Sequence, residues 1–231
     1  MFLNKKILKF GGFNSTVLRR PVNGRFLMDC FLSRILNVGF AALLMIVTLP
    51  IFLISALIVL LDSGPPIFFC QKRVGYNGKI FTLFKLRTMK KDSIDDPDAR
   101  LNLFEQTSKS TRVIRMLSID ELPQLINVIK GDMNIVGPRP LLPEYKEIYS
   151  VEQSRRHQVK PGITGWAQIN GRNSLGWDEK LGLDVWYVDN RSFLIDLRII
   201  FATPFAMLFK GGVNSSECET MPKLRKKRES N

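Results

Sequence analysis

Residues 35–61 are ILNVGFAALLMIVTLPIFLISALIVLL, an apolar run without a charged side chain. As a straight helix this run would measure about 40 Å, whereas the hydrocarbon core of a bilayer is roughly 30 Å thick. Pro50 lies inside the run and lacks a backbone hydrogen-bond donor, so it forces a kink or a break. The arms on its two sides would measure about 22 Å and 16 Å, and each is too short to cross a membrane alone.

Both flanks of this run are basic. Lys72 and Arg73 follow it, and one acid, Asp29, accompanies the basic residues that precede it, namely Lys5, Lys6, Lys9, Arg19, Arg20, Arg25 and Arg34. Because basic flanks favour the cytosol, a re-entrant helical hairpin that enters and leaves one leaflet accounts for the pattern. A bent spanning helix is the alternative that these residues leave open. Thr48 or Ser55 is expected to pair with the backbone groups that Pro50 frees.

The composition restricts the chemistry of the rest of the chain. Lys and Arg outnumber Asp and Glu by 34 to 21, which indicates an anionic partner: nucleic acid, lipid headgroups or phosphorylated small molecules. The three cysteines are scattered, so we expect reduced thiols rather than disulfides. His157 is the only histidine, which excludes a histidine-rich zinc site. Carboxylate, Lys and Arg chemistry is expected, with any metal a hard ion such as Mg²⁺.

The sequence after Asp62 predicts a compact α+β domain. Residues 67–70 and 79–86 predict a small β-hairpin around Gly75, Asn77 and Gly78. Helices are expected at 118–130, with Leu122, Leu125, Ile126 and Ile129 on one face, and at 143–157. Residues 90–110 predict a polar loop, and 137–143 and 161–176 predict Gly/Pro-rich loops. Residues 178–190 are mixed in character and rich in aromatics.

The last part of the chain contains a second apolar segment. Residues 192–210 are interrupted by Asp196, Arg198 and Pro204, so this segment is not expected to span a membrane. It either lies in the membrane interface or packs on the core. The terminal KLRKKR is either a solvated tail or an electrostatic tether to anionic lipid.

Four regions follow from these patterns. They are a basic N-terminal extension (1–33), a re-entrant membrane helix broken at Pro50 (34–61), a cytosolic catalytic domain with an interfacial helix near 192–210 (62–216), and a basic tail (217–231).

The densest chemical signal is LSIDELPQLINVIKGDMNIVGPRP, residues 117–140. Ser118 or Asp120 can cap the predicted helix, with Glu121 close behind. Asp120 and Glu121 then lie at a positively polarised helix end, which is expected to orient these carboxylates and lower their pKa. Simple capping is the alternative role for the pair.

Four basic residues lie nearby in contexts without periodicity: Lys85 in FKLRTM, Arg115, Arg139 in GPRP, and Arg172 in NGRN. A guanidinium on a rigid Pro or Gly loop suits bidentate binding of phosphate. Each could also be a solvated surface charge, but together with the acid pair they predict a phosphate-handling site. No Walker A loop or dinucleotide-binding glycine fingerprint is present in the sequence. The acidic stretch from Asp92 to Asp98 is expected to be a solvated loop.

Four segments in this order resemble one family: KIFTLFKLRTM, RMLSIDELPQLINVIKGDMNIVGPRPLL, VKPGITGWAQINGRN and LDVWYVDNRSFLIDL. They are similar to the bacterial sugar transferases, the small monotopic polyprenyl-phosphate phosphoglycosyl transferases. The resemblance runs from about 33 to about 211. It implies a re-entrant helix broken at a proline, which favours the hairpin at Pro50.

The resemblance also implies a reaction at the cytosolic face of the bacterial inner membrane. The residue matching Asp120 attacks the sugar-proximal phosphate of a UDP-sugar, releases UMP and carries the phosphosugar, which then passes to polyprenyl phosphate. Mg²⁺ would be held by Asp120 and Glu121, and phosphates by Lys85, Arg115, Arg139 and Arg172. The product would begin capsule, O-antigen, exopolysaccharide or glycoprotein glycan assembly, starting from a UDP-N-acetylated sugar, with UDP-galactose or UDP-glucose as second choices. Whether the protein forms a homodimer stays open.

This chain departs from the family pattern at two positions. Leu49-Pro50 replaces the usual Ser-Pro at the break, and Asn37 replaces an Asp near the start of the membrane helix. Two other functions are compatible with a basic chain that carries an apolar segment. A nucleic-acid binder would leave the Asp120–Glu121 pair without a role, so nucleic acid is not expected as a partner, and the second rival is a non-catalytic membrane scaffold of a glycan assembly complex.

Overall fold

The computed structural model describes residues 24–89, 108–171 and 175–209, with side chains placed from 33 to 207 within these ranges. Arg172, the acidic stretch from Asp92 to Asp98, most of the basic N-terminal extension and the basic tail lie outside the described residues. The helices and strands are α1 (Gly24–Ser63), β1 (Phe68–Val74), η1 (Tyr76–Gly78), β2 (Ile80–Leu86), α3 (Lys109–Met116), η4 (Ile119–Glu121), α4 (Gln124–Lys130), β3 (Asn134–Val136), η5 (Pro143–Glu147), α5 (Val151–Ser154), η6 (Arg155–Gln158), β4 (Gly162–Thr164), α6 (Trp166–Asn170), α7 (Trp177–Asn190) and α8 (Phe193–Phe209).

The predicted α+β class agrees with this mixture of helices and two small sheets. β1 and β2 form the predicted antiparallel hairpin, with Phe68 paired to Leu86 and Val74 to Ile80. β1 is longer than expected, because its charged second half still pairs with β2. The turn places Asn77 at φ 52°, a conformation that asparagine tolerates well. β3 and β4 pair in parallel and form a separate sheet.

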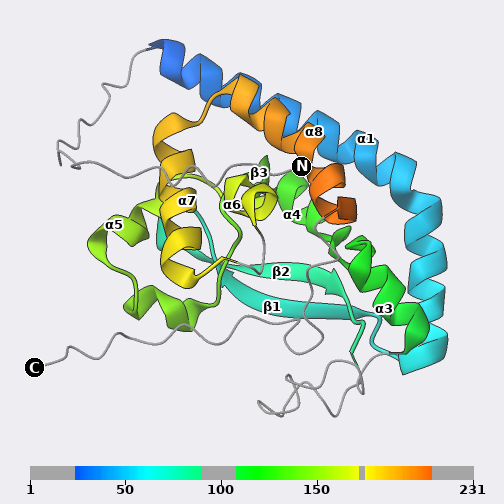
Figure 1. Cartoon of the computed structure of the whole chain (residues 1–231). Coiled ribbons are helices and arrows are strands. Elements are labelled where there is room, and N and C mark those ends of the chain that lie inside the picture. Colours follow the sequence, from blue (N-terminus) through cyan, green and yellow to red (C-terminus); the bar gives the residue numbers. More distant parts are fainter. Residues whose placement is uncertain (1–23, 90–107, 172–174, 210–231) are drawn as a thin grey trace, which may run out of the picture.

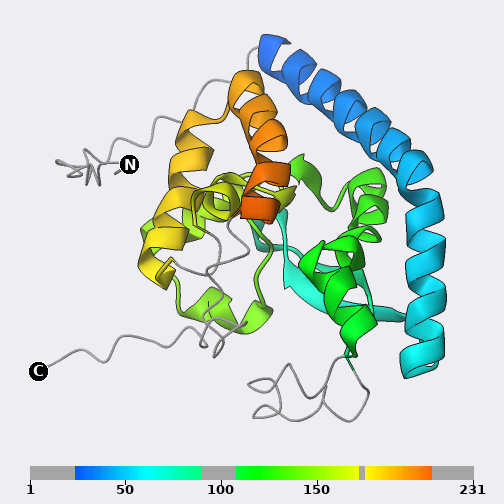
Figure 2. The ribbon, with the colours of Figure 1, turned by 45° about the vertical axis from the view of Figure 1, so that its right-hand side comes forward.

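Helix α1 is continuous through Pro50 but changes direction. It begins at Gly24, ten residues before the predicted start at 34. Its first arm slants across the top of the molecule and its second arm runs down one side, in both Figure 1 and Figure 2. The stretch Ser33–Ser63 is long and apolar enough to cross a membrane, judged by length and composition. Pro50 explains the bend, since proline cannot donate to the carbonyl of Ile46.

Thr48 was expected to form a hydrogen bond with a backbone group that Pro50 leaves unpaired, but it bonds elsewhere. The Thr48 hydroxyl donates to the Leu44 carbonyl over 2.7 Å, not to the carbonyl of Ile46. Hydroxyl bonds of this kind to the preceding turn tend to bend helices, so Thr48 adds to the curvature. Ser55 is buried on the concave side of α1.

Both ends of the apolar part of α1 are bound to the same globular body. Near the first end, Arg34 donates to the carbonyls of Val128 and Ile129 over 2.6 and 2.7 Å, which satisfies the C-terminal end of α4. The Asn37 amide oxygen accepts from the backbone N–H of Ile135 over 2.8 Å. At the far end, Arg87 donates to the carbonyls of Ser63 and Gly64, each over 2.6 Å. The body therefore lies within the bend of α1 (Figure 2).

The main core joins α1 to β2, α4, β3, α7 and α8. It comprises Ala41, Leu83, Leu125, Val128, Met133, Ile135, Val136, Val159, Tyr187 and Ile199. One face of α8 enters this core through Ile199, while its other face leaves Phe193, Leu194, Phe201 and Phe205 exposed. The predicted apolar segment at 192–210 is thus a helix that packs on the core along one side only.

Three predicted elements are corrected by the structure. The helix expected at 118–130 is a 3-10 turn followed by α4, because Pro123 occupies the N-cap, and Ile126 on its predicted apolar face is exposed. The helix expected at 143–157 is split into η5, α5 and η6, since Ser150 starts a new helix with a capping box to Gln153. The loop expected at 161–176 contains β4 and α6. Residues 177–190 form α7.

Candidate active site

The tight turn η4 places the two predicted acids. Ser118 adopts a left-handed conformation, φ 54°, between α3 and the turn, and its side chain caps no helix. Its carbonyl accepts from the N–H of Glu121 over 3.1 Å. The predicted capping role of Ser118 or Asp120 is therefore wrong: Pro123 is the N-cap of α4. Asp120 and Glu121 lie in the turn that precedes α4, and neither side chain caps that helix.

Glu121 is held by two cations. Lys85 Nζ lies 2.7 Å from Glu121 Oε1. Arg139 approaches both carboxylate oxygens, at 2.6 Å for Oε1 and 3.3 Å for Oε2, a bidentate geometry. Although burial opposes ionisation, Arg139 and Lys85 hold the pKa of Glu121 well below its usual range. Both cations therefore favour the ionised form of Glu121, and its carboxylate in turn positions Lys85 and Arg139.

The pKa of Asp120 is shifted in the opposite direction to that of Glu121. Burial, together with the negative charge of Glu121, raises the pKa of Asp120 to about 6. Lys85, Arg115 and Arg139 act in the other direction. Among the residues that the structure describes, none donates a hydrogen bond to the Asp120 carboxylate. The predicted lowering of this pKa by the helix end is wrong, because desolvation outweighs it. With a pKa of about 6 the group is still mostly ionised at neutral pH, and it has no hydrogen-bond partner within the described ranges.

Lys85 and Arg139 reach the acids from two different elements. Asn127 of α4, fully buried, fixes Lys85 indirectly: it accepts from the N–H of Phe84 over 3.2 Å and donates to the carbonyl of Thr82 over 2.8 Å. This amide joins β2 to α4, so Lys85 and the acid turn keep a constant separation. Nothing in the local sequence pattern singled out Asn127.

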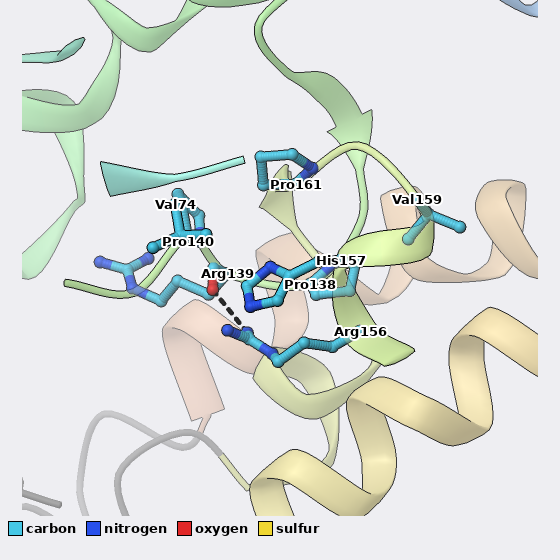
Figure 3. Close-up of a pocket in the computed structure, with 8 residues that line it drawn as sticks. All are labelled: Val74, Pro138, Arg139, Pro140, Arg156, His157, Val159 and Pro161. Carbon is cyan, nitrogen blue, oxygen red and sulfur yellow. Dashed lines mark hydrogen bonds between the residues drawn. The ribbon is translucent and has the colours of Figure 1, made fainter. Parts of the chain in front are cut away.

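Two buried or partly buried arginines donate hydrogen bonds to backbone carbonyls of the GPRP loop that carries Arg139. Arg156 donates to the carbonyl of Arg139 over 2.7 Å, and Figure 3 shows this bond beneath the loop. Arg73 donates to the carbonyl of Pro140 over 3.2 Å. Arg156 and Asp184 form an ion pair at 2.7 Å with both side chains almost fully buried. Burial raises the pKa of Asp184, while Arg156 opposes that shift.

Arg115 lies on α3, just before the acid turn, and its charge acts on Asp120. One of its terminal nitrogens is buried without a hydrogen-bond partner in the part of the chain that the structure describes. The structure thus brings Lys85, Arg115 and Arg139 together around Asp120 and Glu121. Sequence reasoning missed Arg73, Arg156 and Asp184, because charged residues in polar segments give no sign of burial.

The same acids are the oxygen ligands that this site can offer to a metal. In residues 24–89, 108–171 and 175–209, no three carboxylate, histidine or cysteine side chains gather into a cage. Mg²⁺ commonly takes only one or two carboxylates from a protein and completes its shell with water and substrate phosphates. The Asp120 carboxylate, which accepts no hydrogen bond from the described residues, is compatible with binding of that kind, while both oxygens of Glu121 already accept from Arg139.

Comparison with known proteins agrees with this geometry. Residues 28–210 match the profile of the family described as bacterial sugar transferase. An uncharacterized sugar transferase of Bacillus subtilis, EpsL, is 50% identical over 188 residues, which cover 80% of this chain and 91% of that protein. An undecaprenyl-phosphate glucose phosphotransferase of Komagataeibacter xylinus is 40% identical over 210 residues, 84% of this chain but 39% of that longer protein.

A third relative has a name that states a reaction. The UDP-glucose:undecaprenyl-phosphate glucose-1-phosphate transferase of Caulobacter vibrioides is 37% identical over 187 residues, 76% of this chain and 69% of that protein. The family match and the named relatives make this chain a phosphoglycosyl transferase, and the long apolar helix α1 is consistent with membrane association. The chain belongs to the bacterial sugar transferase family.

Proposed function

We propose that this enzyme transfers a phosphosugar from a UDP-sugar to a polyprenyl phosphate, with Asp120 as the nucleophile. The observation that carries the proposal is the contrast within the acid pair. Glu121 is occupied by Lys85 and Arg139, whereas Asp120 is ionisable, has no hydrogen-bond donor among the described residues and is surrounded by cations. A carboxylate of this kind can attack phosphorus without a general base.

The proposed reaction has two steps. An Asp120 oxygen attacks the sugar-proximal phosphorus, the bond from that phosphorus to the bridging oxygen breaks, and UMP leaves. An oxygen of polyprenyl phosphate then attacks the same phosphorus, and the bond to Asp120 breaks. The carboxylate is regenerated, and the product is a polyprenyl diphosphate sugar.

Charge is the main obstacle in both steps, because an anion attacks an anionic phosphate. Lys85, Arg115 and Arg139 provide fixed positive charge beside the reacting group, where charge develops in the transition state. Bound Mg²⁺, held by Asp120 or Glu121 and by diphosphate oxygens, would supply further neutralisation of the phosphates. Arg172, outside the described residues, stays a predicted phosphate ligand.

We also propose that α1 is re-entrant and that the active site lies at the cytosolic face of a bacterial inner membrane. The support is the attachment of both ends of the apolar helix to one body, by Arg34 at the first and Arg87 at the second. A straight spanning helix would place its ends on opposite sides of the bilayer. The exposed aromatic face of α8 would then contact the membrane interface.

Glucose and an N-acetylated sugar are two candidates for the sugar of the donor. Two of the three relatives above are named for glucose, whereas the sequence resemblance favours an N-acetylated sugar. The test is a panel of UDP-sugars assayed for UMP release by the full chain, with and without undecaprenyl phosphate. Release with one or a few donors, coupled to formation of lipid-linked sugar, is expected. No release from any UDP-sugar would refute the proposal and favour the scaffold alternative.

A further inference from the structure

An apolar groove lies between the second arm of α1 and helix α3, which run beside each other in Figure 1 and Figure 2. It has a volume of about 390 Å³. Its lining residues are Ile51, Ile54, Ser55, Ile58, Ser110, Val113, Ile114 and Ile119. Apart from two serines, every lining residue is isoleucine or valine, so the groove suits a hydrocarbon rather than a sugar or a nucleotide.

The groove reaches the turn that carries the acid pair. Ile119, one of its lining residues, belongs to η4 and immediately precedes Asp120 in the chain. Arg115 follows Ile114 on α3, and its buried terminal nitrogen has no hydrogen-bond partner in the described part of the chain. A molecule with an apolar tail in the groove would thus carry its head to a cation and a nucleophile.

The other boundary of the groove is the membrane helix itself. Ile51 and Ile54 line the groove and are also among the exposed residues of α1. Because the exposed surface of this arm is apolar, the groove is accessible from the hydrocarbon side, and a lipid can enter it laterally without crossing water.

We propose that this groove binds the phosphate-proximal isoprene units of the polyprenyl phosphate acceptor. The proposal rests on the proposed function. Its occupant has an anionic head that complements Arg115 and a branched apolar tail that complements the isoleucine walls. At roughly 30 Å³ for each heavy atom, the groove has room for on the order of a dozen carbons, or about two or three five-carbon units. The rest of the tail stays in the bilayer.

The test uses two tryptophan substitutions on α1 in the full chain. Ile54 lines the groove and is 61% exposed, while Leu57 is 54% exposed and does not line it. Both positions tolerate a larger side chain because each is open on one side. Ile54→Trp fills the groove, and Leu57→Trp is the matched control. Two rates are measured for each variant: UMP release in a single turnover with UDP-sugar alone, and transfer to undecaprenyl phosphate over a range of concentrations.

We expect Ile54→Trp to raise the KM for undecaprenyl phosphate by about tenfold or more, the effect of a changed fit in an apolar pocket. Single-turnover UMP release should stay within about twofold of wild type, and Leu57→Trp should match wild type in both rates. Equal acceptor KM values for the two variants would overturn the groove proposal and leave the reaction intact. If Ile54→Trp slows UMP release as much as transfer, the groove does not act on the acceptor, and the proposal also fails. Absence of UMP release in the wild type would instead overturn the proposed function.

Discussion

At the scale of single residues, two neighbouring carboxylates have different roles because they have different partners. Glu121 is fixed by the fork of Arg139 and by Lys85 and stays ionised. Asp120, one residue earlier, is desolvated and lacks such partners among the described residues, so burial raises its pKa to about 6. A raised pKa makes a carboxylate a better nucleophile while leaving it mostly ionised at neutral pH.

Arg139→Lys tests the bidentate contact between the Arg139 guanidinium and the Glu121 carboxylate. Lysine keeps the charge but cannot bind both carboxylate oxygens, so we expect kcat/KM for the UDP-sugar to fall at least about tenfold. Arg139→Ala should cost more, about 100- to 1,000-fold, as expected for loss of a transition-state donor. Initial rates of UMP release measure both. Arg191→Lys, the same change at an exposed position after α7, is the control. Wild-type rates in Arg139→Lys would contradict the bidentate role.

The partly buried His157 is expected to make the stability of the fold depend on pH. Burial, with the charges of Arg156 and Lys146, lowers the pKa of His157 to about 4, against 6.5 for the free side chain. Protonation therefore favours the unfolded chain, so stability is full above pH 6.5 and declines as the pH falls towards 4. As the pH is lowered from 6.5 to 4, we expect the Tm of His157→Gln to fall less than the Tm of wild type. Identical pH profiles for both proteins would contradict this assignment.

At the scale of elements, the acid turn depends on segments that lie behind it. The Arg156–Asp184 pair connects η6 to α7, and Arg156 extends to the carbonyl of Arg139 in the GPRP loop. Gly137 allows this loop to approach the chain closely, since a Cβ there would lie 2.4 Å from the carbonyl of Lys160. The GPRP loop is thus positioned by contacts with segments that are distant in the sequence.

Removing one member of the buried pair should separate stability from function. Arg156→Met leaves the Asp184 charge uncompensated, which is expected to cost about 3–5 kcal/mol of unfolding free energy. The double variant Arg156→Met/Asp184→Leu should recover most of that loss, because an apolar pair can replace a buried ion pair. The KM for UDP-sugar should be higher than in wild type for both the single and the double variant. In both of them the Arg139 carbonyl has lost its donor, Arg156. Denaturant unfolding and donor kinetics give both quantities. A double variant with wild-type KM would show that the pair is only structural.

Elements with a strong local signal were predictable from sequence, and elements built from distant contacts were not. The β-hairpin followed from two strand-like stretches separated by the turn residues Gly75, Asn77 and Gly78, and the kink of α1 followed from Pro50. The parallel pairing of β3 with β4 joins segments far apart in the chain, so a Gly/Pro-rich sequence suggested only a loop. The acid pair Asp120–Glu121 was predicted from the sequence. The nearby cations Lys85, Arg115 and Arg139 were predicted with it. The raised pKa of Asp120 was not, because desolvation depends on the packed structure.

At the scale of the whole molecule, the bent helix α1 encloses the body that carries the site. Its concave side contributes Ala41 and Val59 to buried positions, and its other side exposes apolar residues such as Ile46, Val47 and Leu57. This arrangement leaves one side of the helix for lipid and one for protein, which suits a protein that is embedded in a single leaflet.

The proposed topology predicts that both termini face the same side of the membrane. Single cysteines introduced among residues 5–20 and 223–230, with Cys30, Cys70 and Cys218 replaced by serine, should be labelled together by an impermeant reagent. In Pro50→Ala the restored backbone donor favours a straighter helix, so part of the population should expose the two regions on opposite sides. Opposite sides in the protein with Pro50 intact would mean a spanning helix.

The most direct measurement of the proposed chemistry is the intact mass of the full chain after mixing with its UDP-sugar, without any lipid acceptor. Because the first step leaves the phosphosugar on Asp120, the wild-type mass should rise by one phosphosugar as UMP is released. Undecaprenyl phosphate should then restore the original mass, and Asp120→Asn should show neither the adduct nor UMP. An Asp120→Asn variant that still gains the adduct, or transfers sugar phosphate to lipid at the wild-type rate, would contradict the assignment of Asp120 as the nucleophile.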